Sequence, residues 1–343
     1  MRGKNRRAAI GILIGMMFLL TTFVSPPLYA ARYPDPSKAI EFIVPVGVGG
    51  GYDLYVRMIV PYLAKELGTK IRIRNEPGGA WLVGLGQIYK AKPDGYTIGI
   101  WNPGLLMNDK DILGKVKFDM TTYTYLYRIT NEPRVVIVKK DGPIKDFKDL
   151  LAKGKSPDFK VRASYAGGTA LLDAKLMDSE WGIDTEKIPY KGGSDTRMAV
   201  MRGDVHFCVS GLGAAAEVVS SGRLKVILLL DEDPMVKVGE AQKLIKDFPE
   251  LKSVPIPKDL GLKPLSYNTR SARCIIAPPG LPKDIKATLE NALAKVMKNK
   301  DLLELGFKTD RPLGVGQKGD DYRDQMKRDK QALMKMKHLI EEL

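Results

Sequence analysis

Glycine is concentrated in one short stretch, VGVGGGYD at residues 46–53, which holds four glycines in eight residues. The stretch follows the apolar run IEFIVP and precedes the helix-like run DLYVRMIVPYLAKEL. Free N–H groups at a helix N-terminus bind carboxylate, sulfate or phosphate, and glycine lets such an anion approach closely. We therefore expect an anion site here. Asp53 would oppose an anion if it pointed inward; the alternative is an acid that stabilises the first helical turn.

Nucleotide-binding loops do not fit this stretch. A P-loop requires Lys after its last glycine, but Gly51 is followed by Tyr52 and Asp53. The dinucleotide fingerprint G-x-G-x-x-G also fails, because Tyr52 or Leu54 stands at its third glycine position. We expect no nucleotide cofactor.

Catalytic and metal-binding patterns are equally scarce. The two histidines, His206 and His338, are far apart and show no zinc-ligand spacing. Ser210 lacks the flanking glycines of a nucleophile elbow. The sequence therefore predicts a binding protein without metal or cofactor, and not an enzyme. Cys208 and Cys274 lie in apolar runs, where we expect buried free thiols, although an exported protein could pair them.

Apolar strand-like runs alternate with helical patterns from residue 40 onward, which predicts an α/β fold. The expected strands are 40–46, 70–75, 96–101, 134–139, 159–165, 187–190, 205–210, 224–230 and 274–277. The expected helices include 53–67, 81–90, 147–153, 170–181, 283–299 and 320–343. Two further glycine turns, at residues 166–169 and 192–193, also stand between a strand and a helix. Ligands of open α/β sheets bind where such turns meet.

The N-terminus has the order of segments typical of a secretory signal. Four basic residues occur in the first seven, an uncharged apolar run covers residues 8–24, and small residues follow at Ala30 and Ala31. We predict a signal peptide at residues 1–30, cleaved after Ala30, and a periplasmic or otherwise extracytoplasmic protein. The alternative is an uncleaved membrane anchor.

The formal net charge is +15. Basic residues are interspersed with acids along the whole chain and are not interleaved with aromatic residues, so we expect a solvated basic surface and no nucleic acid partner. A positive field of this kind would help collect anionic solutes.

Several motifs, in order along the chain, resemble those of the extracytoplasmic solute receptors of tripartite tricarboxylate transporters, the Bug or TctC type. The main ones are GGGYD at 49–53, NEPGGA at 75–80, KPDGYT at 92–97, PYKGG at 189–193, RGDV at 202–205 and PPGLP at 278–282. Each motif alone is weak, but together they span nearly the whole chain after the predicted signal.

The resemblance implies a two-lobed periplasmic-binding-protein fold of type II, with two mixed sheets flanked by helices and two hinge crossovers. Lobe 1 would comprise residues 31–131 plus 231–343, and lobe 2 residues 132–230. Such receptors hold carboxylates largely through backbone amides and ordered waters of glycine loops, and deliver the ligand to membrane transporter subunits. We expect a monomer. The alternatives are an exported enzyme acting on a carboxylate, or a receptor for another transporter or a sensor kinase.

The departures from the family pattern concern the ligand. Tyr52 replaces a small hydroxyl residue, Trp81 follows the second glycine loop, and the late aromatic residue before the PPGLP turn is absent. Tyr52, Trp81, Trp101 and Tyr165 could line an aromatic-rich cleft for an aromatic carboxylate, unless two or more of these rings are packing residues. The predicted ligand-binding residues are Val48, Gly49, Gly50, Gly51, Tyr52, Asp53, Trp81, Asn102, Tyr165, Gly167, Gly168, Thr169, Gly192, Gly193 and Ser210.

Overall fold

A computed structural model describes residues 33–49, 51–238, 241–265, 267, 270–309, 311, 313 and 316–341. The fold that positions the site belongs to the unit Pro36–Leu343. The predicted signal peptide at residues 1–30 and Gly50 of the first glycine turn lie outside the described residues.

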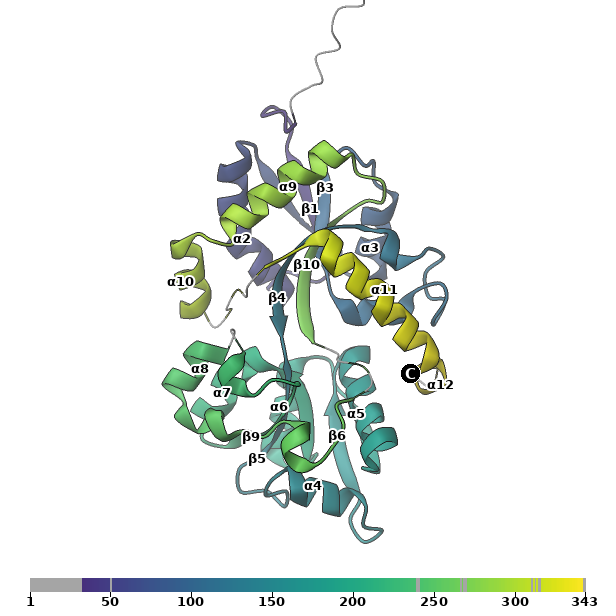
Figure 1. Cartoon of the computed structure of the whole chain (residues 1–343), viewed down its shortest axis with the longest axis vertical. Helices are drawn as coiled ribbons and strands as arrows, with labels where there is room; N and C mark the ends of the chain where they lie inside the picture. Colours follow the sequence, from purple (N-terminus) through teal and green to yellow (C-terminus); the bar gives the residue numbers. More distant parts are fainter. Residues whose placement is uncertain are drawn as a thin grey trace, which may run out of the picture. The chain divides into compact units, whose positions relative to one another are not determined.

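One mixed sheet has six strands in the order β11-β4-β10-β3-β1-β2 (Figure 1). Its strands are β1 (Ile40–Val44), β2 (Ile71–Asn75), β3 (Thr97–Trp101), β4 (Thr124–Glu132), β10 (Ser271–Ala277) and β11 (Gln317–Lys318). β1 pairs in parallel with β2 and β3, whereas β10 runs antiparallel to β3 and β4. The loops after β1, β2 and β3 therefore leave the sheet at one edge.

The second mixed sheet has five strands in the order β7-β6-β8-β5-β9. These are β5 (Arg134–Lys139), β6 (Val161–Tyr165), β7 (Thr185–Pro189), β8 (Phe207–Gly211) and β9 (Leu224–Leu230). β6 is parallel to β7 and β8, and β5 is antiparallel to β8 and β9. Here too, the loops after three parallel strands share an edge.

Helices flank both sheets, and most of them match the predicted ones. Those of the first sheet are α2 (Gly51–Leu67), α3 (Leu82–Lys90), α9 (Lys283–Val296), α10 (Lys300–Lys308), α11 (Gly319–Lys335) and α12 (Lys337–Ile340). Those of the second are α4 (Phe147–Gly154), α5 (Gly167–Trp181), α6 (Gly193–Arg202), α7 (Ala215–Ser220) and α8 (Gln242–Asp247). In place of the single helix expected over 320–343, the structure has two helices: α11 ends at Lys335 and α12 begins at Lys337. Short 3-10 helices include η1 (Gly79–Trp81), η2 (Pro103–Asn108), η3 (Met120–Thr122) and η4 (Leu212–Ala214).

The two mixed sheets confirm the predicted two-lobed α/β fold. The chain passes from the first sheet to the second at Pro133, between β4 and β5, and returns between β9 and β10. The residue limits given for the two lobes stay a prediction.

β4 is the main element that the sequence analysis missed. Its signal was available, because TYLYRITNE is rich in aromatic and β-branched residues, which are favoured in strands. Nearly every residue of β4 is buried, since β10 and β11 pair with its two edges and helices pack on it.

Apolar cores stabilise the two sheets, and the core of the first also includes Leu172 and Leu176 of α5. Ile43, Leu85, Trp101, Tyr125 and Ile276 belong to the core of the first, whereas Ile137, Cys208 and Leu229 belong to one core of the second. Cys208 and Cys274 are both buried and free, as expected.

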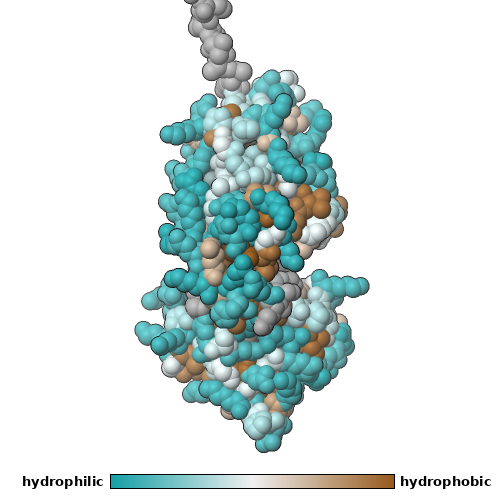
Figure 2. Space-filling model, turned by 90° about the vertical axis from the view of Figure 1, so that its right-hand side faces the viewer, coloured by the Kyte–Doolittle hydropathy of each residue, from teal (hydrophilic) through white to brown (hydrophobic). Residues whose placement is uncertain are grey.

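The surface drawn in Figure 2 is mostly hydrophilic, with small hydrophobic patches. The exposed large hydrophobic side chains include Val48, Val83, Met198, Val236, Leu305 and Met334. In the described part of the chain, no helix is both long enough and apolar enough to cross a bilayer. The same residues hold no group of three or more histidine, cysteine or acidic side chains suited to a metal ion.

Candidate ligand-binding site

The first glycine turn connects β1 to α2 and is braced by Asp53. This buried carboxylate accepts hydrogen bonds from the Gly49 N–H at 2.8 Å, from Arg57 Nε at 2.7 Å and from Asn75 Nδ2 at 2.9 Å. Burial pushes the pKa of Asp53 up, but these hydrogen bonds outweigh it and hold the pKa below its usual value. Asp53 is thus an acid that stabilises the first turn of α2, which was the alternative to a residue that faces the anion. Its carboxylate already occupies the Gly49 N–H. Val48 is 75% exposed beside it.

Tyr52 joins the loops that follow β1, β2 and β3. Its ring meets Trp81 of the second loop edge to face, with centroids 4.4 Å apart. Its hydroxyl accepts a hydrogen bond from Asn102 Nδ2 of the third loop. Asn102 also caps η2, because its Oδ1 accepts the Gly104 N–H at 2.7 Å. Burial raises the pKa of the Tyr52 phenol, so it remains protonated and able to donate.

Trp101 does not belong to this cluster, which corrects the expectation that it lines an aromatic cleft. Its side chain has no exposed surface and packs against Tyr123 and Tyr125, at centroid distances of 5.8 and 5.7 Å. Successive strand residues point to opposite faces, and the last residue of β3 faces the core. Trp101 is therefore a packing residue.

Trp81 adopts an unusual backbone conformation at the end of η1. Its φ is +81°, in the left-handed region, and its half-buried ring packs on the core as well as on Tyr52. Of the proposed aromatic lining, the structure brings Tyr52 and Trp81 together.

The second-lobe glycine turn before α5 contacts the third loop of the first lobe. A Cβ placed on Gly104 would lie 1.8 Å from Thr169 Oγ1, and one on Gly168 would lie 2.7 Å from Met107 Cε. A side chain at Gly104 would require Thr169 to move, whereas at Gly168 the flexible end of Met107 could shift. Gly104 was not among the predicted residues, although its position three residues after a strand was a usable signal.

The other predicted second-lobe residues lie at the corresponding edge of the second sheet. Tyr165 ends β6, Gly192 caps α6 and Gly193 begins it, and Ser210 is near the end of β8. Among the described residues, these four make no hydrogen bond or ring contact with Tyr52, Trp81 or Asn102. Their role in binding stays a prediction.

Two charged residues at the crossovers were missed. Arg273 on β10 lies over the rings of Tyr52 and Tyr55, with its Cζ 4.9 and 4.2 Å from the two centroids. Its Nη1 donates to Glu132 Oε1 at 3.0 Å and to Thr130 Oγ1 at 3.2 Å. Burial lowers the pKa of Arg273, but Glu132 and the tyrosines outweigh it, so the pKa is raised and the charge is retained.

Glu132, the last residue of β4, connects both lobes. Besides Arg273, it accepts hydrogen bonds from the Tyr55 hydroxyl at 3.2 Å and from the Gly213 N–H of η4 at 3.1 Å. A charged residue in a mostly buried strand can indicate a functional site, and Glu132 of β4 and Arg273 of β10 are such residues. Their proximity, however, depends on the β4–β10 register, which the sequence does not reveal.

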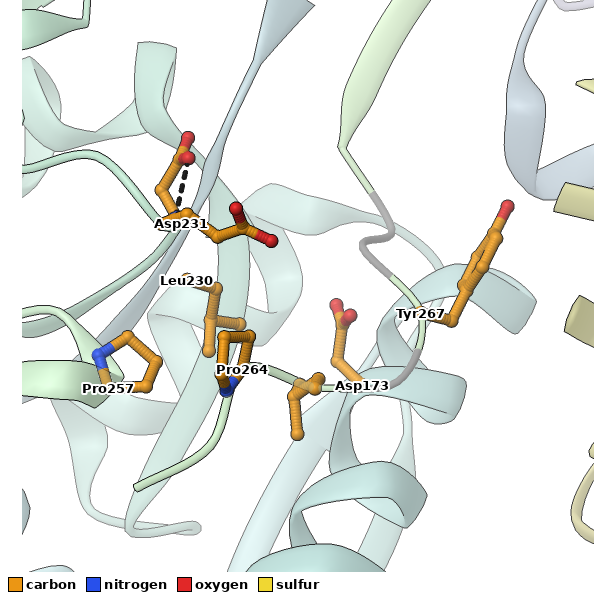
Figure 3. Close-up of a pocket in the computed structure, with 8 residues that line it drawn as sticks. Asp173, Leu230, Asp231, Pro257, Pro264 and Tyr267 are labelled. Carbon is orange, nitrogen blue, oxygen red and sulfur yellow. Dashed lines mark hydrogen bonds between the residues drawn. The ribbon is translucent and has the colours of Figure 1, made fainter. Parts of the chain in front are cut away.

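A separate cavity of about 30 Å³ lies where β9 ends (Figure 3). Asp173 of α5, Asp231 and Tyr267 are among its lining residues. Both aspartates have arginine partners, Arg134 at 2.5 Å and Arg270 at 2.6 Å. A cavity of this volume holds a water molecule or two, so it is too small for a solute of several heavy atoms.

The fold defines a class of protein: a two-lobed α/β protein of the periplasmic-binding-protein type, with glycine turns at the strand ends of both lobes. The chain belongs to the tripartite tricarboxylate transporter family receptors, because the model of that family, TctC, matches residues 55–343.

Curated relatives and solved structures agree with this assignment. A UPF0065 protein of Bordetella pertussis is 26% identical over 75% of this chain and 76% of its own length. Protein BugT of the same organism is 24% identical over 87% of this chain and 86% of its own.

Among solved structures, a TctC solute binding protein from Polaromonas covers 90% of this chain and 99% of its own, with a TM-score of 0.71 and 22% identity. MatC from Rhodopseudomonas palustris with bound malate covers 89% and 100%, with a TM-score of 0.68 and 20% identity. The R. palustris protein Rpa4515 with adipate covers 89% and 96%, with a TM-score of 0.66 and 21% identity. At these identities the structural likeness supports the fold.

Proposed function

We propose that the protein is an extracytoplasmic receptor that captures a small-molecule carboxylate between its lobes and delivers it to a membrane transporter of the tripartite tricarboxylate type. The observation that supports this most is the meeting of three β–α junctions of the first lobe at Tyr52, next to the α5 N-terminus of the second. Backbone N–H groups at a helix N-terminus favour anions; since Asp53 and Asn102 already occupy the Gly49 and Gly104 N–H groups, we expect the start of α5 to supply them. Two structural neighbours were solved with the carboxylates malate and adipate.

The proposed ligand-binding residues come from both lobes, so binding would couple to their closure. Tyr52, Trp81 and Asn102 would supply the first wall, and Gly168 and Thr169 part of the second. A ligand stabilises the closed form only by contacts that the open form lacks. The close approach of Thr169 to Gly104 joins the two walls within the protein, so a ligand held between them would contact both lobes.

The ligand class that this site would favour is an aromatic acid. The edge-to-face pair of Tyr52 and Trp81 offers a ring surface to a flat solute. Replacing Trp81 by Ala should weaken binding of an aromatic carboxylate severalfold. Equal affinity in the variant, by calorimetry, would remove Trp81 from the site.

A thermal-shift screen of ligand-free protein tests the receptor function. Malate, adipate, citrate and benzoate are compared with their uncharged amides on a chain beginning at Ala31. An acid at 100 times its dissociation constant adds about 2.7 kcal/mol of stability, which raises Tm by several degrees. A shift with an acid and not with its amide is expected. No shift with any acid, in folded ligand-free protein, would contradict the proposal.

Export is the second part of the proposal and has its own test. Expression of the full chain in a Gram-negative host should yield a periplasmic protein whose N-terminal residue is Ala31, by mass spectrometry of the purified protein. An intact N-terminus in the membrane fraction would favour the anchor instead.

A further inference from the structure

Arg273 has more hydrogen-bond donors than the protein uses. A guanidinium carries five N–H donors, and among the described residues only Nη1 finds acceptors, in Glu132 and Thr130. Within the described residues, the buried Nε of Arg273 has no hydrogen-bond partner, and Nη2 donates to no acceptor. Glu132 therefore contacts the guanidinium at one nitrogen, not in the two-point geometry that arginine and carboxylate favour.

The carboxylate of Glu132 also accepts hydrogen bonds from two groups other than Arg273. Its Oε1 accepts from Tyr55 as well as from Arg273, and its Oε2 accepts from the Gly213 N–H. Tyr55 and the Gly213 N–H are neutral donors, but they occupy acceptor positions of the Glu132 carboxylate. Glu132 therefore contacts Arg273 through Oε1 and Nη1 alone, which leaves Nη2 to donate to a second anion.

Tyr52 presents a donor close to this guanidinium. Its oxygen accepts from Asn102, which leaves the hydroxyl proton to donate elsewhere. The ring that carries this hydroxyl is the ring over which Arg273 lies. One carboxylate could accept from both residues, because each of its oxygens has two acceptor positions.

We propose that Arg273 and Tyr52 bind a carboxylate group of the ligand directly, so that the receptor selects ligands by their charge and not by backbone amides alone. This rests on the proposed receptor function and names the residues that determine specificity within it. A charge-assisted, partly buried hydrogen bond discriminates strongly against an uncharged analogue, because the analogue leaves the cation without its partner.

The test measures charge discrimination: the ratio of dissociation constants for adipate monoamide and adipate, and likewise for malate. Wild-type protein should favour each dianion at least about tenfold, as expected for one charged hydrogen bond. In Arg273→Gln the ratio should fall to about threefold or less, and in Tyr52→Phe the affinity for the acid should fall severalfold.

Two controls separate recognition from folding. The double variant Arg273→Gln/Glu132→Gln removes both charges, so no buried carboxylate is left unpaired. This double variant should show the same loss of discrimination as Arg273→Gln. Arg270→Gln removes an arginine that pairs with Asp231, and it should keep the wild-type ratio.

The outcomes are distinct. Wild-type ratios in Arg273→Gln and in the double variant would overturn this inference and leave the receptor function intact. If wild-type protein binds neither dianion nor any acid of the screen, the receptor function itself fails, and this inference with it.

Discussion

Two cations with little exposed side chain, Lys330 and Arg273, have opposite hydrogen-bond balances. Lys330 of α11 places its ammonium 2.8 Å from Asp109, 2.6 Å from Asp111 and 3.0 Å from Asp119, so its three N–H donors meet three carboxylates. Arg273, with five donors, uses two. Their side chains are similarly buried, at 9% and 14% exposed. Burial therefore does not separate a structural cation from one with capacity for a ligand; the count of donors against acceptors does.

The surroundings of Lys330 agree with a structural role. Asp109 also accepts the Asp111 and Met120 N–H groups, at 3.0 and 2.6 Å, and Asp119 caps η3 through the Thr121 N–H at 2.8 Å. These bonds fold the segment between η2 and η3 around the ammonium and attach it to α11.

The largest expected effect comes from replacing Lys330 by Met. Three carboxylates would lose their shared partner, and breaking a buried ion pair of this kind costs about 3–5 kcal/mol. We expect urea unfolding to show this loss, while the folded variant keeps its affinity for carboxylates.

Lys327→Met is the matched control for that variant. Lys327 lies on the same helix and pairs with Asp324 at 3.4 Å, with both side chains more than half exposed. Its loss should cost less than about 0.5 kcal/mol. Equal stability of the two variants would refute the structural role of Lys330.

Gly104→Ala should have the next largest effect, on binding. The new methyl group would collide with Thr169 Oγ1, which separates η2 from α5 and disfavours closure. We expect affinity for the acid to fall about tenfold, or roughly 1.4 kcal/mol, by calorimetry.

A double-mutant cycle with Thr169→Ala checks the cause. The cost of Gly104→Ala should shrink in the Thr169→Ala background, because the colliding oxygen is absent. An undiminished cost would show that Gly104 acts on binding through some other contact.

The smallest effect concerns acid pH at the Lys330 cluster. Hydrogen bonds from Lys330 and then Lys110 lower the pKa of Asp111 to about 2, and that of Asp119 is lowered as well. The folded state thus binds fewer protons than the unfolded state below about pH 4. The stability from these acids is present above about pH 4 and is lost as the pH falls towards 2.

Urea midpoints measured from pH 6 to pH 2.5 should therefore decline more steeply for wild-type protein than for Lys330→Met. Parallel curves would mean that the ammonium does not hold these acids ionised.

The sequence predicted local features well and long-range pairing poorly. Strands 134–139 and 224–230 match the structure to the residue, because buried apolar runs have clear ends. The glycine turns were found because glycine marks the strand-to-helix junction itself. Glu132 and Arg273 were missed, since 141 residues separate them and only the β4–β10 register joins them. Trp101 was misplaced because its type did not reveal which face of β3 it occupies.

The position of a bound dicarboxylate in a crystal structure of the protein tests the central claim most directly. We expect one carboxylate within hydrogen-bond distance of Arg273 Nη2 and the Tyr52 hydroxyl, between Trp81 on one side and the α5 N-terminus on the other. A dicarboxylate bound elsewhere, with Arg273 still contacting only Glu132 and Thr130, would contradict it.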